Sequence, residues 1–310
     1  MRIKVLGAAA GGGFPQWNCA CPNCRGVREG NDALRPLLQS SLAVSANAKD
    51  WYLINAGPDV HRQIESFSAL HPGPGIRETP LAGVILTDAE LDHTIGLLSL
   101  REGSSLTIYG TEIVRKSLQS AFPVIPMLQN YCSWEWQILS PDVRQRVGSL
   151  EEGTKETITV ETVPVSKKAP LYARWSQQDD GSKDFWEVGL VFHNESSDRR
   201  LAYFPTLESI TPSIESCLRK ADILMVDGTF WSENELVRMG AAVRDSRSMG
   251  HLPISGQSGI AERLASIPAK RKIMIHINNS NPILKKDSIE RYALEQLGFE
   301  VAYDGMEVEV

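Results

Sequence analysis

The chain has 310 residues, of which 42% are hydrophobic and 23% are charged, and its formal net charge is −6 at pH 7. This composition excludes a disordered chain, and the interspersed acidic and basic residues argue against non-specific nucleic-acid binding. No apolar run reaches the roughly 18 residues of a transmembrane helix, and Met1–Gly7 is too short for a signal peptide, which predicts a cytoplasmic protein without a membrane segment.

The N-terminal segment Ile3–Gly7 is predicted to be a strand, and it leads into the consecutive glycines Gly11, Gly12 and Gly13. Glycines after a strand permit positive φ and a close approach of the backbone to another group. A dinucleotide-binding loop is an alternative interpretation. It is disfavoured because the G-x-G-x-x-G spacing is absent and Pro15–Asn18 does not open a helix.

Three cysteines, Cys19, Cys21 and Cys24, follow within six residues, whereas Cys132 and Cys217 stand alone. This distribution does not indicate a disulfide framework. Thiolates at the first spacing can occupy three corners of a tetrahedral zinc ion, although they could also lie close together without a metal. We predict a structural zinc that clips a loop at about residues 11–30, with a fourth ligand from elsewhere in the chain.

Hydrophobic periodicity then predicts strands and helices in alternation, with polar residues gathered at the strand ends. Strands are predicted at Leu42–Ser45, Trp51–Gly57, Leu81–Leu86, Leu106–Gly110, Ile158–Val165, Val188–Phe192, Leu201–Phe204, Ile223–Val226 and Lys272–Ile277. Helices are predicted at Val60–Leu70, Ile95–Leu100, Thr111–Ser120, Pro212–Lys220, before Ala265, and at Asp287–Leu297. Residues 122–156 are predicted to be irregular, with aromatic side chains that either line a pocket or, as we prefer, fill core. Either a layered αββα sandwich or a doubly wound sheet would satisfy this pattern.

The strand at Leu81–Leu86 is followed by a cluster of side chains that could bind a metal or transfer a proton: Asp88, Glu90, Asp92 and His93. Alternate residues of an extended turn can point to one place above the edge of a sheet, where α/β enzymes place their sites. The alternative is a solvated acidic loop that caps the N-terminus of the following helix.

Other candidate residues lie at the ends of later strands. Asp227 follows the strand at Ile223–Val226 and is expected to orient a histidine or a loop, and His276 ends the last core strand. His251 precedes a helix and is either an acid or base near the substrate or a structural histidine. The remaining histidines, which have no partner motif and are assigned to surface or core, are His61, His71 and His193.

Five segments together resemble the coenzyme PQQ synthesis protein B family of the metallo-β-lactamase superfamily. They are Gly11–Cys24, Asp88–His93, Val226–Phe230, Met249–Ile254 and His276–Pro282. The resemblance extends over the whole chain. It implies one metallo-β-lactamase-like domain over residues 1–310, with two central mixed β-sheets flanked by helices, and a role in the biosynthesis of pyrroloquinoline quinone (PQQ).

The resemblance also assigns metal ligands. In two-metal members of the superfamily, the first metal takes two leading histidines, which Asp88 and Glu90 replace here, and a third histidine where this chain has Ser166. The bridging aspartate of these members is replaced by Pro205–Leu207. The first metal site is therefore expected to be lost.

The second metal site of the superfamily is expected to be kept, with Asp92, His93 and His276 as ligands. Two histidines and one carboxylate, with open positions, are typical of non-haem Fe(II) enzymes. The resemblance implies an iron-dependent hydroxylation, with O2, of the tyrosine-derived ring of a cross-linked glutamate–tyrosine precursor. Zinc is expected to replace iron often on purification. Two alternatives are a phosphodiesterase-like metal-dependent hydrolase and a carrier that assists transport of PQQ or its precursor to the periplasm.

Further roles follow as expectations. Glu90 and Asp88 are candidates for additional metal ligands, for residues that orient the histidines, or for bases that accept a phenol proton, and Glu90 is the preferred additional ligand. Asn279 lies where related proteins with the same cysteine motif supply a histidine to zinc, although an asparagine is a poor zinc ligand. The expected partners are the small peptide-derived precursor and O2, with a homodimer considered. The side chains considered for substrate contact are Ser166, Arg247, Asp227, Lys167 and Lys168.

Overall fold

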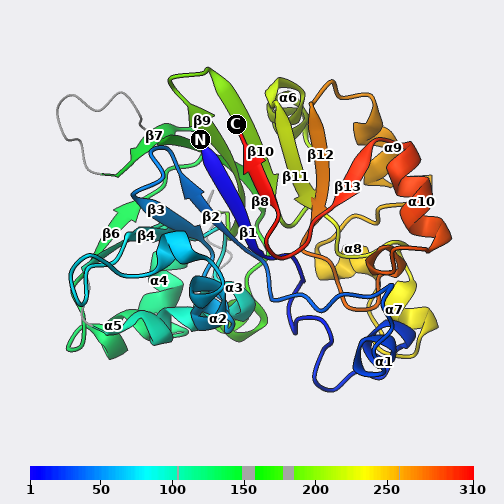
Figure 1. Cartoon of the computed structure of the whole chain (residues 1–310), viewed down its shortest axis with the longest axis horizontal. Coiled ribbons are helices and arrows are strands. Elements are labelled where there is room, and N and C mark those ends of the chain that lie inside the picture. Colours follow the sequence, from blue (N-terminus) through cyan, green and yellow to red (C-terminus); the bar gives the residue numbers. More distant parts are fainter. Residues whose placement is uncertain (103–104, 149–157, 177–184, 258) are drawn as a thin grey trace. The chain divides into compact units, whose positions relative to one another are not determined.

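The computed structural model describes residues 1–102, 105–148, 158–176, 185–257 and 259–310 (Figure 1). It contains two compact units, which are described separately. The first unit consists of Met1–Leu6, Ser41–Arg199 and Gly305–Val310, and the second consists of Gly7–Ser40 and Arg200–Asp304. The prediction of a single domain over the whole chain stays a prediction.

The strands form two seven-stranded mixed sheets. The first sheet has the order β14 (Glu307–Glu309), β1 (Arg2–Gly7), β2 (Ser41–Ser45), β3 (Trp51–Ile54), β4 (Leu81–Ile85), β5 (Leu106–Gly110) and β6 (Trp134–Ile138). Strands β3 to β6 are parallel, whereas β1 pairs antiparallel with β14 and β2 pairs antiparallel with β3. The carboxyl ends of the parallel strands therefore lie at one edge of the sheet, and the acidic motif follows β4 at this edge.

The second sheet has the order β13 (Phe299–Val301), β12 (Arg271–Ile275), β11 (Ile223–Asp227), β10 (Arg199–Phe204), β9 (Glu187–Asn194), β8 (Ile158–Ser166) and β7 (Arg144–Val147). Within the first unit, β7, β8 and β9 are antiparallel. Within the second unit, β10 to β13 are parallel. Two mixed seven-stranded sheets with flanking helices confirm the predicted α/β class of the fold.

Helices of the first unit cover the first sheet through an apolar core (Figure 1). They are α2 (Val60–Glu65), η1 (Ser68–Leu70), α3 (Leu91–Thr94), η2 (Ile95–Leu100), α4 (Glu112–Ser120), α5 (Val124–Leu128) and η3 (Leu171–Ser176). Val114 and Leu118 of α4 are fully buried in the same cluster as Val84 and Ile108 of the sheet. This burial follows from the apolar spacing that predicted α4.

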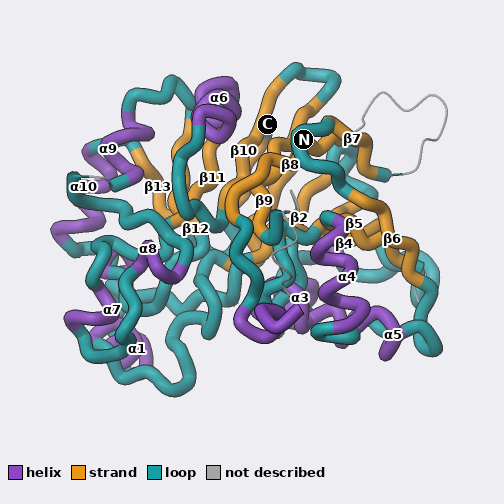
Figure 2. Tube along the Cα trace, turned by 180° about the vertical axis from the view of Figure 1, so that it is seen from behind, coloured by secondary structure: helices purple, strands orange, loops and turns teal. Residues whose placement is uncertain are grey.

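The second unit has its own set of helices (Figure 2). They are α1 (Pro22–Arg28), α6 (Pro212–Lys220), α7 (Glu235–Arg238), α8 (Ser246–Met249), α9 (Ile260–Ala265), η4 (Pro282–Leu284) and α10 (Ile289–Gln296). Hydroxyl caps begin two of them: Thr211 accepts a hydrogen bond from Ile214 N, and Ser288 accepts one from Arg291 N. These caps satisfy amides that the helix itself leaves without partners.

Residues 122–156 are more regular than predicted. Their described part contains α5, β6 and β7, so the expectation of an irregular segment was wrong there. Both strands are the terminal strands of their sheets, and β6 alternates half-buried and exposed residues. A short edge strand of this kind carries a weak hydrophobic pattern.

The segment Ile95–Leu100 is a 3₁₀-helix instead of the expected amphipathic α-helix. Gly96 N donates to Ala56 O at 2.9 Å, and a Cβ at Gly96 would lie 2.1 Å from Gly57 O. The backbone of this segment therefore packs directly on the turn after β3. That close approach depends on tertiary structure, which periodicity does not report.

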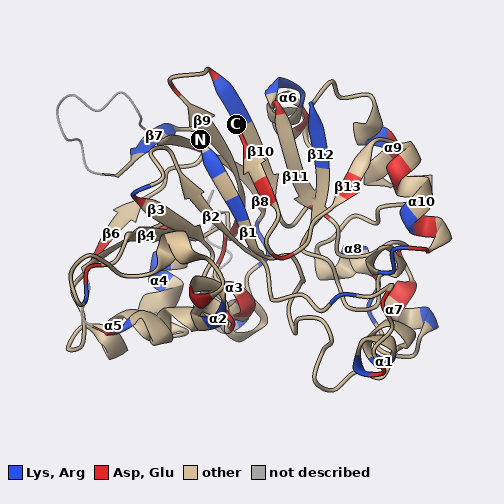
Figure 3. Cartoon of the chain, in the orientation of Figure 1, with Lys and Arg blue, Asp and Glu red and all other residues tan. Residues whose placement is uncertain are grey.

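Charged residues of both signs are spread along the strands and helices (Figure 3). On α10, for example, Arg291 Nε donates to Glu295 Oε1 at 2.7 Å, one turn away. Among the described residues, no helix has both the length and the apolar character that crossing a bilayer requires.

Candidate metal centres

The acidic motif of the first unit runs from the turn after β4 into α3, and its centre is a buried Asp88–His93 pair. Each of these two residues is 1% exposed. His93 Nδ1 lies 2.7 Å from Asp88 Oδ2 and 2.9 Å from Asp88 Oδ1. Asp88 also accepts hydrogen bonds from Glu90 N at 2.9 Å and from Thr87 Oγ1 at 2.6 Å. Asp88 therefore fixes the His93 ring and the turn together.

Sequence reasoning missed the residue that anchors the start of this turn, Asn55. Asn55 follows β3 with a φ of 63°. Its Oδ1 accepts from Thr87 N at 3.0 Å, and its Nδ2 donates to Thr87 Oγ1 at 2.9 Å. A buried asparagine directly after a strand is a weak signal, because asparagine tolerates the left-handed conformation in many turns.

Negative charge predominates in the turn. His93 Nε2 lies 3.8 Å from Asp92 Oδ2. Burial lowers the pKa of His93, but Asp88 and Asp92 outweigh it and raise that pKa to about 10. Burial, with Asp88 and Asp92, raises the pKa of Glu90 to about 7. Three carboxyl groups around one imidazole form a site that a divalent cation would neutralise.

Several predicted substrate contacts also lie in the first unit. Ser166 is buried at the end of β8, and its Oγ accepts from Lys168 N at 3.1 Å. The charge of Lys168 opposes the rise in the pKa of Glu90, whereas Lys167 Nζ lies 5.5 Å from the centre of the Phe185 ring. Of the two lysines considered for substrate contact, Lys168 is therefore the one whose charge acts on the acidic motif.

In the second unit, Asp227 is fully buried at the end of β11. Its Oδ2 accepts from His251 Nδ1 and from Leu207 N, each at 2.8 Å. Its Oδ1 accepts from Thr229 N at 3.0 Å and from Thr229 Oγ1 at 2.6 Å. Burial raises the pKa of Asp227, but His251 and these hydrogen bonds outweigh it and lower that pKa. Because the carboxylate has about four acceptor positions, this arrangement suits an orienting residue.

His276 and His251 lie against each other in this unit. Their rings stack with centroids 5.6 Å apart and planes 21° apart. His276 has a φ of 59°, and potential ligand atoms of Asp227, His251 and His276 all lie within 4.8 Å of one another. Thr229, which sequence reasoning missed, contacts all three residues. Its only sequence signal is a hydroxyl two residues after an aspartate at a strand end.

The remaining candidates are distributed over both units. Asp92 and His93 belong to the first unit and His276 to the second, so the three-residue ligand set stays a prediction. Arg247 Nε donates to Glu233 Oε2 at 3.2 Å in the second unit. His193 Nε2 lies 3.3 Å from Glu161 Oε2 in the first unit. The exposed histidines are His61 and His71.

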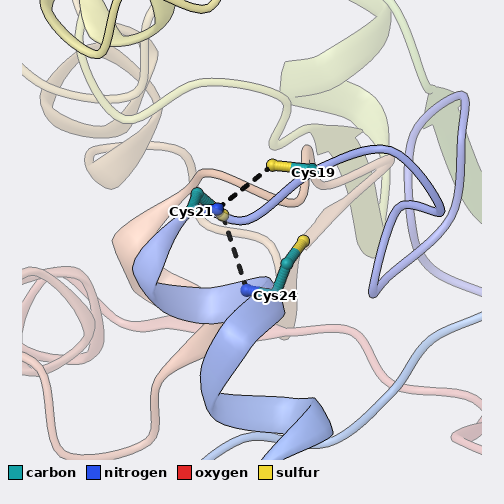
Figure 4. Close-up of side chains that lie close together, drawn as sticks. All are labelled: Cys19, Cys21 and Cys24. Atoms are coloured by element: carbon teal, nitrogen blue, oxygen red, sulfur yellow. Dashed lines mark hydrogen bonds between the residues drawn. The ribbon is translucent and has the colours of Figure 1, made fainter.

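The cysteine motif gathers three sulfur atoms at the start of α1 (Figure 4). Cys21 is the N-cap of this helix and accepts from Cys24 N at 3.4 Å, while Cys19 Sγ accepts from Cys21 N at 3.4 Å. The sulfur atoms of Cys19, Cys21 and Cys24 lie within 4.8 Å of one another. Such a set matches three corners of a tetrahedral zinc site.

Asn279 comes from the opposite end of the chain to this cluster. Its Nδ2 lies 3.1 Å from Cys19 Sγ, 3.6 Å from Cys21 Sγ and 3.3 Å from Cys24 Sγ. Burial raises the pKa of Cys24 to about 11, whereas hydrogen bonds outweigh burial at Cys19 and lower its pKa. A half-turn of the amide would bring Oδ1 to the sulfurs, because amide nitrogen and oxygen have the same shape. Three thiolates fit a zinc ion, whereas an amide oxygen is a poor ligand for it, so the contact from Asn279 stays a prediction.

Known proteins share the sequence and the fold. The β-lactamase superfamily domain matches residues 50–277. A coenzyme PQQ synthesis protein B from Methylococcus capsulatus is 44% identical over 309 residues, 99% of each chain. The coenzyme PQQ synthesis protein B from Methylobacillus flagellatus is 41% identical over 309 residues, again 99% of each chain.

The crystal structure of zinc-bound PqqB from Methylobacterium extorquens aligns with 100% of both chains at a TM-score of 0.88 and 33% sequence identity. Identity at this level over full length goes beyond a shared fold. The chain is therefore a member of the coenzyme PQQ synthesis protein B family, within the metallo-β-lactamase superfamily.

Proposed function

We propose that this protein is an enzyme of PQQ biosynthesis that hydroxylates, with O2, the tyrosine-derived ring of a cross-linked glutamate–tyrosine precursor. Full-length identity of 44% to a coenzyme PQQ synthesis protein B carries the assignment to the pathway. The chemistry of the donor residues supports the reaction type, because two histidines and one carboxylate suit Fe(II) with positions left for O2 and substrate.

The ligands in this proposal are Asp92, His93 and His276. Bound Fe(II) would supply the redox chemistry that activates O2. His93 fits this role because Asp88 holds its Nδ1 at 2.7 Å, which directs Nε2 to the side of Asp92. A metal-ligating histidine commonly has its second nitrogen held by a carboxylate in this way. Zinc would bind to the same donors, and a relative at 33% identity has been crystallised with zinc bound.

Two other groups would handle protons. Glu90, with a pKa of about 7, can accept the phenol proton of the precursor near neutral pH. His251 is held through Nδ1 by the buried Asp227 at 2.8 Å, which leaves Nε2 to accept or donate a proton on the other side of the ring. Lys168, close enough to influence Glu90, is the preferred cation for a precursor carboxylate.

The hydrogen bonds of Asp88 argue against the hydrolase alternative. A two-metal hydrolase would need a ligand at this position, whereas both Asp88 oxygens accept hydrogen bonds from within the turn. This engagement favours one metal in the acidic motif over two.

Oxygen consumption tests the proposal. Anaerobically prepared, Fe(II)-loaded protein is mixed with the cross-linked precursor and then with O2. We expect O2 uptake and a hydroxylated product with iron, and no uptake with zinc. Asp92→Ala should abolish uptake by removing a ligand, whereas His71→Ala, at an exposed histidine of the first unit, should keep it.

Two outcomes would contradict the hydroxylase. Turnover of the precursor without O2 would favour a hydrolase. No turnover, with tight calorimetric binding of PQQ by the same Fe(II)-loaded protein, would favour a carrier.

A further inference from the structure

We infer that Thr229 is a positioning residue, whose hydroxyl fixes the tautomer and orientation of the His276 ring, and of the His251 ring beside it, for metal binding and proton transfer. This inference deepens the proposed function, on which it rests, because it takes His276 as a metal ligand. The residues that carry it all belong to the second unit.

The Thr229 hydroxyl lies at the centre of the cluster. Its Oγ1 is 2.6 Å from Asp227 Oδ1, 2.9 Å from His276 O, 3.0 Å from His276 Nδ1 and 3.1 Å from His251 Nδ1. Thr229 itself is 3% exposed, so these contacts are shielded from bulk solvent. One oxygen atom therefore links both imidazoles to the buried carboxylate.

Counting protons determines the direction of these hydrogen bonds. A hydroxyl donates one proton and accepts about two hydrogen bonds, whereas carboxylate and carbonyl oxygens only accept. The proton of Thr229 points to Asp227 Oδ1, because that contact is the shortest and its acceptor is charged. His276 Nδ1 must then carry a proton and donate it to Thr229 Oγ1 at 3.0 Å.

This direction determines which ring nitrogen can bind a metal. When Nδ1 of a neutral imidazole carries the proton, the lone pair lies on Nε2. His276 would thus present Nε2 as its ligand atom, as Asp88 makes His93 do in the first unit. His251 Nδ1 is directed in the same way, since Asp227 Oδ2 at 2.8 Å and Thr229 Oγ1 both accept from it.

Thr229 also holds the backbone that carries His276. His276 has a φ of 59°, a left-handed conformation that is unusual for a residue with a side chain. Asn278 N donates to Thr229 O at 3.1 Å, and Thr229 Oγ1 accepts from His276 Nδ1, so main-chain and side-chain hydrogen bonds of Thr229 lie on both sides of this residue. A β-branched side chain is stiff about χ1, which explains why threonine suits a position that demands one hydroxyl direction.

The test compares Thr229→Val, which keeps the shape without the hydroxyl, with Thr229→Ser, which keeps the hydroxyl. Long-range ¹H–¹⁵N NMR of the full-length, metal-free protein with ¹⁵N-labelled histidine reports the tautomer of each ring at fixed pH. We expect the Nδ1–H tautomer of His276 in the native protein and in T229S. We expect a mixture of tautomers, or the Nε2–H tautomer, in T229V.

Zinc alone is the probe of metal affinity, and the His276 ¹⁵N shift distinguishes binding at this ring from binding at the cysteines. We expect T229V to bind zinc at His276 about 10–100-fold more weakly, the usual effect of losing an outer-shell partner. T229S should restore affinity to within about threefold, which a merely structural role would not require.

Thr162→Val is the matched control, because Thr162 is fully buried in β8 and its Oγ1 has no hydrogen-bond partner among the described residues. It should leave both tautomers and the affinity unchanged. Should T229V fail to fold by near-ultraviolet circular dichroism, Thr229→Ala provides the same comparison.

Unchanged His276 tautomer and zinc affinity in T229V, or in T229A, would overturn the inference. The tautomer readout needs neither iron nor substrate. A protein that shifts tautomer as expected but consumes no O2 would therefore refute the hydroxylase and leave the role of Thr229 standing.

Discussion

Asp88 illustrates how one residue acquires a role different from the one its position suggests. It stands where two-metal relatives are expected to carry a ligand, yet it accepts hydrogen bonds from Thr87, Glu90 and His93. A carboxylate used in this way cannot also offer its best lone pairs to a cation. In the proposed site, Asp88 would therefore act on the metal through His93.

This role predicts the effect of Asp88→Asn on metal binding. The asparagine keeps the shape of Asp88 but removes the charge that favours the orientation of the His93 ring. We expect iron or zinc to bind to the acidic motif about 10–100-fold more weakly, measured by competition with a chromophoric chelator. Asp32→Asn, at an exposed site, is the control and should have no effect. Unchanged affinity in D88N would show that His93 needs no carboxylate partner.

Among the structural elements, the loop between β12 and η4 connects two candidate sites. It begins at His276 and carries Asn279, which reaches the cysteine cluster three residues later. Asn23 Nδ2 donates to Asn279 O at 3.1 Å and to Asn281 O at 2.9 Å. Asn281 Nδ2 in turn donates to Gly228 O at 2.9 Å, beside Thr229. The cysteine cluster and His276 thus share one rigid segment.

Glu235 of α7 is the other anchor of this loop. Ser280 Oγ donates to Glu235 Oε1, and Trp231 N donates to Glu235 Oε2 at 2.7 Å. Burial raises the pKa of Glu235. The folded state therefore holds the Glu235 proton to a higher pH than the unfolded state does, and this group contributes most to stability at low pH.

The pH dependence of unfolding tests this anchor. As pH rises from about 4.3, the ordinary pKa of an unfolded glutamate, through the raised folded value, the contribution of Glu235 to the free energy of unfolding should fall. Glu235→Gln should abolish that fall, because its amide does not titrate and can still accept from Trp231 N and donate to Ser280. Urea unfolding of both proteins at pH 5 and pH 8 measures how the free energy of unfolding of each changes with pH.

Glu235→Ala removes both hydrogen bonds of the anchor and should cost about 1–3 kcal/mol at either pH. Glu233→Gln, which changes a half-exposed carboxylate that pairs with Arg247, is the control and should cost less than about 1 kcal/mol. If the free energy of unfolding changed with pH in the same way in the native protein and in E235Q, the assigned direction of the pKa shift would be contradicted.

For the molecule as a whole, metal binding at the cysteine cluster should contribute to folding. The three cysteines are close in the sequence, but α1 and the distant Asn279 complete their surroundings only in the folded chain. Because the unfolded chain lacks such a site, binding free energy becomes folding free energy. Zinc at about 1,000 times its dissociation constant would stabilise the folded state by about 4 kcal/mol.

Cys24→Ser should therefore lose one equivalent of zinc by elemental analysis and lower the thermal midpoint by several degrees. Cys132→Ser is the matched control, since Cys132 lies apart from the cluster and its Sγ donates to Leu128 O at 3.7 Å. Equal zinc content and equal midpoints in the two variants would contradict a structural zinc at this cluster.

The pattern of elements was largely predictable because it depends on local periodicity. The strand β4, with the acidic motif directly after it, follows from an apolar run broken by polar residues, and α4 and α6 follow from spacing and caps. The edge strands β6 and β7 escaped prediction because half-exposed strands carry little hydrophobic signal. The 3₁₀ form of η2 escaped it because its cause is the backbone that faces Gly96.

The sequence by itself determined which residues are candidates for chemistry and how neighbours along the chain are arranged. Cys19, Cys21 and Cys24 converge because their spacing places them on one helical turn and the residues before it. Only the tertiary structure decided that Asn279 joins them and that Thr229 lies between His251 and His276. Thr229 and His276 come together because each follows one of the parallel strands β11 and β12. No local pattern encodes this pairing, because it joins residues far apart in the chain.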